Sequence, residues 1–176
     1  ARGLSSQQLA AQLAADDEVE YAVPDQRRRA LAVPNDPLFA ASSLISPQAG
    51  QWYLRAPDAT RVSAIDAAGA WDVTTGLSTV VVAVVDTGVL PDHPDLAGQL
   101  LPGYDFIADA SESRDGDGRD ADASDPGDWT TANQCGPGEA AASSSWHGTQ
   151  MAGLVAARAN NGIGMAGSAH GVRVLL

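Results

Sequence analysis

The chain has 176 residues, a formal net charge of −12 and a sequence isoelectric point near 4.3. Its 10 basic residues are all arginines, so it lacks the clustered lysine and arginine side chains on which nucleic-acid binding depends. No apolar run comes near the roughly 18 residues that a membrane-spanning helix requires. We therefore expect neither a nucleic-acid partner nor a membrane partner.

Two elements are expected before Pro24. Ser5 and Gln8 have the spacing of a capping box, which predicts a helix that continues to about Ala15. Apolar and polar residues then alternate over residues 19–23, a pattern that is typical of a strand. Pro24 should end that strand.

The middle of the chain predicts one helix and two strands. Residues 63–66 can cap a helix that Gly76 would end. The unbroken apolar run at residues 80–85 predicts a strand covered on both faces, as in a parallel sheet. A second, short strand is expected at about residues 103–107.

The last elements are a helix and a strand. A helix rich in small residues should begin at His147, and the Asn-Asn-Gly sequence at residues 160–162 supplies a left-handed stop. Residues 171–176 have the composition of a strand. This alternation of apolar strands with helices predicts an α/β fold built on a doubly wound parallel sheet.

Asp86 and His147 are the candidate catalytic residues. Asp86 stands at the carboxyl end of the apolar strand, where polar groups of such sheets carry out chemistry. Thr87 and Gly88 follow at once, so the chain can turn and leave the carboxylate facing a crevice. An aspartate that orients a histidine is the supporting half of a serine-nucleophile mechanism.

These motifs resemble those of the subtilisin-family serine proteases, also called subtilases or peptidase family S8. The resemblance rests on Asp86-Thr-Gly and His147-Gly-Thr-x-x-Ala-Gly, and it continues in His93-Pro-Asp-Leu and Asn160-Asn-Gly-Ile-Gly. The acidic insertion at residues 115–129 is similar to the secreted proteases of Gram-negative bacteria. The resemblance covers nearly the whole chain. It implies a secreted serine endopeptidase, with protein or peptide substrates and a subtilisin-like α/β fold.

The chain also departs from the family pattern. The Gly-Thr-Ser-x-Ala motif that holds the nucleophile is absent from these residues, as is the oxyanion-hole asparagine. Family members carry both further along the chain, so the resemblance implies the amino-terminal half of a catalytic domain, inactive alone. Gln150 lies in the sequence Gly-Thr-Gln-Met-Ala, which is similar to the serine motif but has glutamine at the position of the nucleophile. Because His147 directly precedes this sequence, we interpret it as part of the histidine motif.

The resemblance further implies two domains. A helix, a strand and a proline, followed by Arg27-Arg-Arg29, are similar to the end of the family's inhibitory propeptide. Residues 1–33 would be the carboxyl-terminal part of that propeptide, which keeps a zymogen inactive, and residues 34–176 the start of the peptidase domain. We expect self-processing between Ala30 and Asp36. The opening residues, Ala-Arg-Gly-Leu, do not have the pattern of a signal peptide, and we expect them to come from the interior of a longer protein.

A dense group of carboxylates follows the second predicted strand. Alternation of aspartate with glycine resembles the opening of a calcium-binding loop, in which glycines let successive oxygens converge on one ion. The first candidates for structural calcium ligands are Asp115, Asp117, Asp120 and Asp122. The alternative is a solvated acidic loop. At the level of function, a non-catalytic calcium-binding fragment or a pseudoenzyme remains the alternative to a protease.

Four other features are candidates for chemistry, each with a plainer alternative. His93 lies between aspartates at a spacing that could bind a metal, although neighbouring prolines favour a surface loop, and His170 should be structural or exposed. The serines at 143–145 lack the strained turn of a nucleophile. Cys135 could pair with His147 in a cysteine protease. The family resemblance instead implies a disulfide partner for Cys135 beyond this chain.

Overall fold

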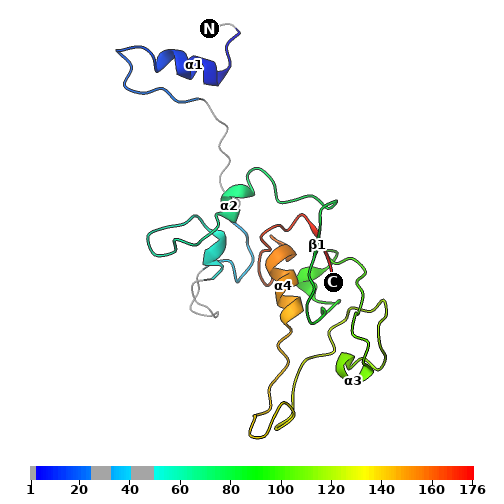
Figure 1. The fold of residues 1–176 in the computed structure, drawn as a ribbon. Coiled ribbons are helices and arrows are strands. Elements are labelled where there is room, and N and C mark those ends of the chain that lie inside the picture. The colour runs from blue at the N-terminus through cyan, green and yellow to red at the C-terminus, as the bar shows by residue number, and fades with distance from the viewer. Residues whose placement is uncertain (1–2, 25–32, 41–49) are drawn as a thin grey trace. The chain divides into compact units, whose positions relative to one another are not determined.

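The computed structural model describes residues 3–24, 33–40 and 50–176 of the chain. The chain divides into two compact units, Ala1–Ala30 and Leu31–Leu176, which are drawn in Figure 1. Both candidate catalytic residues belong to the second unit. Among the described residues, no helix has the length and apolar character needed to cross a membrane.

The first unit contains helix α1 (Ser6–Leu13), which begins at the predicted capping box. The Ser5 hydroxyl accepts from the Gln8 amide at 3.2 Å, and the Ser5 amide donates to the Gln8 side chain at 2.9 Å. The capping box is therefore confirmed, and the helix ends two residues before the predicted Ala15.

The prediction of a strand at residues 19–23 is wrong. These residues have no strand geometry, and Tyr21 and Val23 are 77% and 72% exposed. Alternation specifies a strand only when a neighbouring strand supplies hydrogen bonds and covers one face. The described part of this unit offers no such neighbour. The three arginines at 27–29 and the beginning of the predicted processing segment lie outside the described residues.

The second unit contains a small parallel sheet. Strands β1 (Val81–Ala83) and β2 (Arg173–Leu175) pair with Val82 opposite Val174, which confirms the strands predicted at these two places. The opposite edge of β2 pairs with a segment outside any named strand, where the Leu101 amide donates to the Val174 carbonyl at 2.8 Å. The strand β2 therefore lies in the middle of three parallel segments.

The strand predicted at residues 103–107 does not form. Pairing with β2 and the residue after it begins earlier and reaches Tyr104, whose amide donates to the Leu176 carbonyl at 2.9 Å. The next amide, that of Asp105, donates instead to the Asp120 carbonyl at 3.0 Å. Phe106 is accordingly 63% exposed.

Helix α4 (His147–Ala156) covers one face of the sheet and is the helix predicted at the histidine motif. Its buried side consists of small residues such as Ala152 and Ala156, which pack with Val174 of β2 in the main core. The helix ends at Ala156, before the predicted Asn-Asn-Gly stop, which forms the next turn instead.

The prediction that the apolar strand is covered on both faces is wrong for this chain. Val82 and Val84 pack against the core under α4, whereas Val81 is 48% exposed and Val85 is 92% exposed. In the part of the chain that the structure describes, no element covers the second face of β1. The apolar composition of the strand therefore exceeds what these residues alone can bury.

A second core cluster surrounds helix α2 (Ala67–Ala70), which is shorter than the helix expected over residues 63–76. Asp66 caps it by accepting from the Gly69 amide at 3.2 Å. Because Asp66 has a left-handed backbone, the helix cannot extend back towards residue 63. The remaining short elements are η1 (Trp52–Leu54), η2 (Pro94–Leu96) and α3 (Ala110–Ser113).

Two buried aspartates hold the turn that follows α4. Asp36 accepts from the amides of Asn160 and Asn161, at 2.8 and 3.2 Å. Asp95 accepts from the Asn161 side chain and from the Met165 amide, both at 2.8 Å. These hydrogen bonds fasten residues near the start of the second unit, and the loop after β1, to the end of the helix that carries the candidate histidine.

Candidate active site

Asp86 lies just beyond β1, as the sequence predicted. The Thr87 amide donates to its Oδ1 at 2.8 Å, and Gly88 follows with a φ of 94°, a value that favours glycine. The side chain of Asp86 is 15% exposed. The turn therefore holds a largely buried carboxylate at the end of the strand.

His147 is the first residue of α4, and its ring meets that carboxylate. Nδ1 of His147 lies 2.8 Å from Oδ2 and 2.9 Å from Oδ1 of Asp86. An ionised carboxylate only accepts hydrogen bonds, so Nδ1 carries the hydrogen and Nε2 is left as the basic nitrogen. The His147 side chain is 54% exposed, so a reacting group can approach the ring.

The loop after β1 and the first turn of α4 are tied together beside this pair. The Gly148 amide donates to the Thr87 hydroxyl, and the Leu90 amide donates to the Thr149 hydroxyl, each at 3.0 Å. A Cβ added at Gly148 would fall against the carbonyl of Gly88. The close approach thus depends on glycine at 148, and it sets the distance between the carboxylate and the imidazole.

The residues before His147 are fixed by Asp128. Its carboxylate accepts from the Ser145 amide and, at 2.7 Å, from the Ser145 hydroxyl. These bonds, the hydroxyl bond above all, hold the pKa of Asp128 below its usual range. Trp146 then takes a left-handed backbone, with φ at 53°, and the helix begins. The Ser145 hydroxyl donates to Asp128, which gives no support to a nucleophilic role beside His147.

The remaining candidates are placed away from this chemistry. His93 accepts from the Asp95 amide at 3.3 Å and so caps η2, as a loop residue would. The His170 ring packs edge-on against Trp71, with centroids 5.1 Å apart, which is a structural contact. Cys135 is a free, exposed thiol, and among the described residues no hydrogen bond joins it to a histidine.

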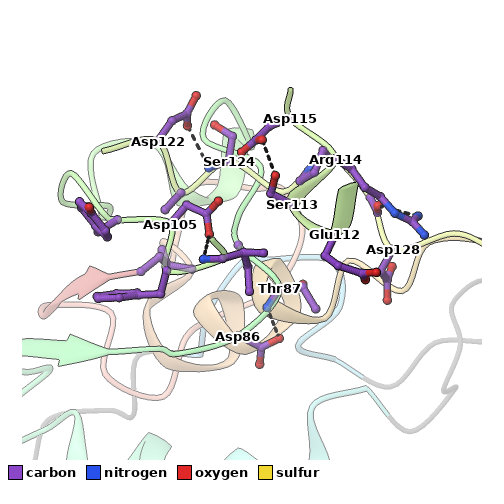
Figure 2. A pocket seen from close by; sticks show the side chains of 18 of the residues that line it. Asp86, Thr87, Asp105, Glu112, Ser113, Arg114, Asp115, Asp122, Ser124 and Asp128 are labelled. Atoms are coloured by element: carbon purple, nitrogen blue, oxygen red, sulfur yellow. Dashed lines mark hydrogen bonds between the residues drawn. The ribbon is translucent and has the colours of Figure 1, made fainter. Parts of the chain in front are cut away.

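A cavity of about 680 Å³ opens between the end of β1 and the acidic insertion at residues 115–129 (Figure 2). Apolar side chains such as Phe106 and Ile107 line it, together with several acidic side chains and one arginine, Arg114. The Arg114 guanidinium lies 5.2 Å from the centre of the Trp129 ring. In Figure 2 the carboxylate of Asp86 points away from those of Asp115 and Asp122 at the opposite rim. Asp86 and the acidic insertion therefore border the same hollow, with their carboxylates on opposite sides.

The four calcium candidates do not converge on one point in this structure. Asp115 accepts from the Ser113 hydroxyl at 2.7 Å and Asp122 accepts from the Ser124 amide at 2.9 Å, and hydrogen bonds from these serines lower both pKa values. Neighbouring carboxylates, Asp120 first, raise the pKa of Asp117.

Oxygen ligands of this kind suit calcium. However, within the described ranges no three His, Cys, Asp or Glu side chains are grouped to hold a metal. Calcium binding stays a prediction.

Asp125 is a buried aspartate, only 6% exposed, that was not among the candidates predicted from the sequence. Its Oδ2 accepts from the Thr87 hydroxyl and its Oδ1 accepts from the Gly127 amide, each at 2.8 Å. The Asp-Pro-Gly-Asp sequence at 125–128 is a turn pattern that could have drawn attention to it. Nothing in the sequence indicates that Asp125 is more buried than the aspartates around it.

Comparison with known proteins gives consistent matches. Residues 78–176 match the family described as the subtilase family, Peptidase S8. The chain is 47% identical to an extracellular protease of Xanthomonas campestris pv. campestris, across 95% of this chain and 26% of that protein. It is 39% identical to an extracellular basic protease of Dichelobacter nodosus, across 93% and 25%.

A solved structure titled as proteases from Pseudoalteromonas arctica superposes with a TM-score of 0.63 at 48% identity, covering 82% of this chain and 38% of that one. The chain spans about a quarter of the length of these two curated relatives.

Proposed function

The chain belongs to the subtilase family, and on that premise we propose that the protein carrying it is a secreted serine endopeptidase that cleaves proteins or peptides. The family match and the similar solved structure confirm the predicted subtilisin-like α/β fold. The observation that carries the proposed activity is the contact of 2.8 Å between His147 Nδ1 and Asp86 Oδ2. Secretion is supported by two relatives that are named as extracellular proteases.

The proposed mechanism gives Asp86 and His147 distinct roles. Asp86 accepts the hydrogen on Nδ1 of His147, which fixes the tautomer and leaves Nε2 free to act. Nε2 takes the proton from a serine hydroxyl as that oxygen attacks the scissile carbonyl, and it later gives the proton to the leaving amine. Between these steps the Asp86 carboxylate stabilises the positive imidazolium.

The serine itself is not among residues 1–176, which contain no Gly-Thr-Ser-x-Ala motif. We infer that it belongs to a segment outside this chain. Without a nucleophile and oxyanion donors, the Asp86–His147 pair lacks the covalent step and the electrostatic stabilisation that supply much of the rate. Residues 1–176 alone should therefore be inactive.

A propeptide at residues 1–33 is part of the same proposal. What supports it is that Ala1–Ala30 forms a compact unit of its own. Pro34 and Asp36 are buried, and Asp36 is bonded to the turn after α4, which supports a start of the peptidase domain close to these residues. Inhibition by this segment would keep the enzyme a zymogen until it cleaves itself.

The test is amide hydrolysis by the complete protein with and without a covalent serine-directed inhibitor, run beside residues 1–176 alone. We expect inhibitor-sensitive turnover in the complete protein only. Turnover that persists after the inhibitor has reacted would contradict a serine nucleophile. A complete protein that folds but never cleaves would contradict an endopeptidase and favour the pseudoenzyme. Inhibitor-sensitive hydrolysis by residues 1–176 would show that the nucleophile lies in this chain.

A further inference from the structure

Asp125 is a buried carboxylate without a basic partner in the described part of the chain. Burying a charged group is costly unless hydrogen bonds replace the water that it loses. Two bonds of 2.8 Å do so here, from the Thr87 hydroxyl to Oδ2 and from the Gly127 amide to Oδ1. Both carboxylate oxygens of Asp125 therefore accept a hydrogen bond.

Thr87 connects this carboxylate to both catalytic candidates. Its amide donates to Asp86 Oδ1 at 2.8 Å, a bond visible in Figure 2. Its hydroxyl oxygen accepts at 3.0 Å from the amide of Gly148, the residue after His147. Thr87 thus bonds Asp86 through its backbone amide, and the first turn of α4 and Asp125 through its hydroxyl.

The direction of these bonds explains what Asp125 contributes. A hydroxyl has one hydrogen to donate and lone pairs to accept with. Because Asp125 takes the hydrogen of Thr87, a lone pair of that oxygen is left facing the Gly148 amide. The helix needs such an acceptor, since Trp146 at its N-cap supplies no side-chain bond.

The backbone holds Asp125 in place for this role. The Val89 amide donates to the Ala123 carbonyl at 3.0 Å, and the Asp125 amide donates to the Val89 carbonyl at 2.8 Å. The segment that carries Asp125 is therefore paired with the turn that carries Asp86 and Thr87. A displacement of Asp125 would be transmitted to the contact between Asp86 and His147.

We propose that Asp125 is a positioning residue, which acts through the Thr87 hydroxyl to hold the Asp86 turn and the start of α4 at the distance that catalysis needs. The proposal rests on the serine endopeptidase function given above. Asp125 is buried, and its carboxylate bonds Thr87 and Gly127 rather than Asp86 or His147. Its effect should fall on turnover, because a small error in the spacing of catalytic groups slows the chemical step.

The test compares three substitutions in the complete enzyme. Asp125→Asn keeps the shape but leaves one acceptor for two donors, and Thr87→Val removes the hydroxyl at nearly constant volume. Both should lower kcat by about ten- to a hundredfold with little change in KM. Thr87→Ser keeps the hydroxyl and should restore kcat to within about threefold of the wild type. The matched control is Asp109→Asn, an exposed carboxylate that caps α3.

A double-mutant cycle separates positioning from general damage. If Asp125 acts through Thr87, the variant carrying both Asp125→Asn and Thr87→Val should be no slower than the worse single variant. Active sites are counted with a covalent serine-directed inhibitor, and kcat is measured well below the melting temperature. Loss of stability alone would lower the number of active sites and leave kcat unchanged.

The outcomes distinguish a failure of the proposed protease function from a failure of the positioning role of Asp125. Wild-type enzyme and Asp109→Asn without inhibitor-sensitive activity would overturn the proposed function, and this inference with it. Active controls together with a kcat within about twofold of wild type in Thr87→Val and Asp125→Asn, or with multiplicative effects in the double variant, would overturn the positioning role alone. If Asp125→Asn does not accumulate as folded protein, the comparison of Thr87→Val with Thr87→Ser decides.

Discussion

Gly148 lies against the turn that follows Asp86, so closely that a Cβ at this position would meet the Gly88 carbonyl and the Cβ of Asp86. This packing brings together two parts of the chain that are 61 positions apart, at the point where His147 meets its carboxylate. A backbone-to-backbone approach therefore determines the geometry of the proposed catalytic pair, Asp86 and His147.

Substituting Gly148→Ala should push α4 away from the Asp86 turn. We expect a loss of about 1–3 kcal/mol in the free energy of unfolding of the complete protein, because the carbonyl of Gly88 cannot move aside as a flexible side chain could. Thermal or urea unfolding measures the change. Turnover should fall as well, since the contact between Asp86 and His147 lengthens.

Gly153→Ala is the matched control on the same helix. A Cβ there would meet only the sulfur of Met165, at 3.5 Å, which is an ordinary contact. Alanine also favours the helix over glycine by about 1 kcal/mol, so this variant should be neutral or slightly stabilised. Equal destabilisation by both substitutions would show that the close approach at Gly148 is unimportant.

A chelator should lower the melting temperature of the complete protein if Asp115, Asp117, Asp120 and Asp122 bind calcium. An ion that binds only the folded state stabilises it by about 2.7 kcal/mol at a hundredfold excess over the dissociation constant. The double substitution Asp115→Asn with Asp117→Asn should abolish the chelator effect, and Asp109→Asn should retain it. An unchanged melting temperature in all three proteins would leave a solvated acidic loop.

Ser145→Ala should alter stability in a pH-dependent way. The hydrogen bonds from Ser145 lower the folded-state pKa of Asp128, so their contribution is present above the ordinary aspartate value of 3.8 and is lost as the pH falls through the lower folded value. The melting-temperature difference between wild type and variant should therefore be present at about pH 6 and shrink below pH 3.8. A difference that grows on acidification would contradict this assignment.

Local signals in the sequence identified the elements whose structure is determined locally. Ser5 and Gln8 predicted the start of α1, and the small residues after His147 predicted α4. The prediction of a strand at 103–107 failed because the Asp105 amide donates to the Asp120 carbonyl, a tertiary contact that no local pattern encodes. Asp125 was missed for a related reason: it resembles its acidic neighbours in sequence, and only tertiary packing buries it.

Self-processing should give a mature amino terminus between Ala30 and Asp36. The complete protein with His147 intact would cleave this segment once, in cis, and His147→Ala should stay uncut. Amino-terminal sequencing of both secreted forms measures the outcome. The same mature end in His147→Ala, in a host free of other proteases, would show that residues 1–33 are not a self-processed propeptide.

The central claim is that Asp86 and His147 are two members of a catalytic triad, and steady-state hydrolysis of a peptide amide by the complete, mature enzyme tests it most directly. His147→Ala and Asp86→Asn should each lower kcat by about 10⁴-fold or more. His93→Ala, which alters a loop histidine that caps η2, should keep kcat within about twofold. Near-normal kcat in His147→Ala and Asp86→Asn, measured on folded protein, would contradict the assignment.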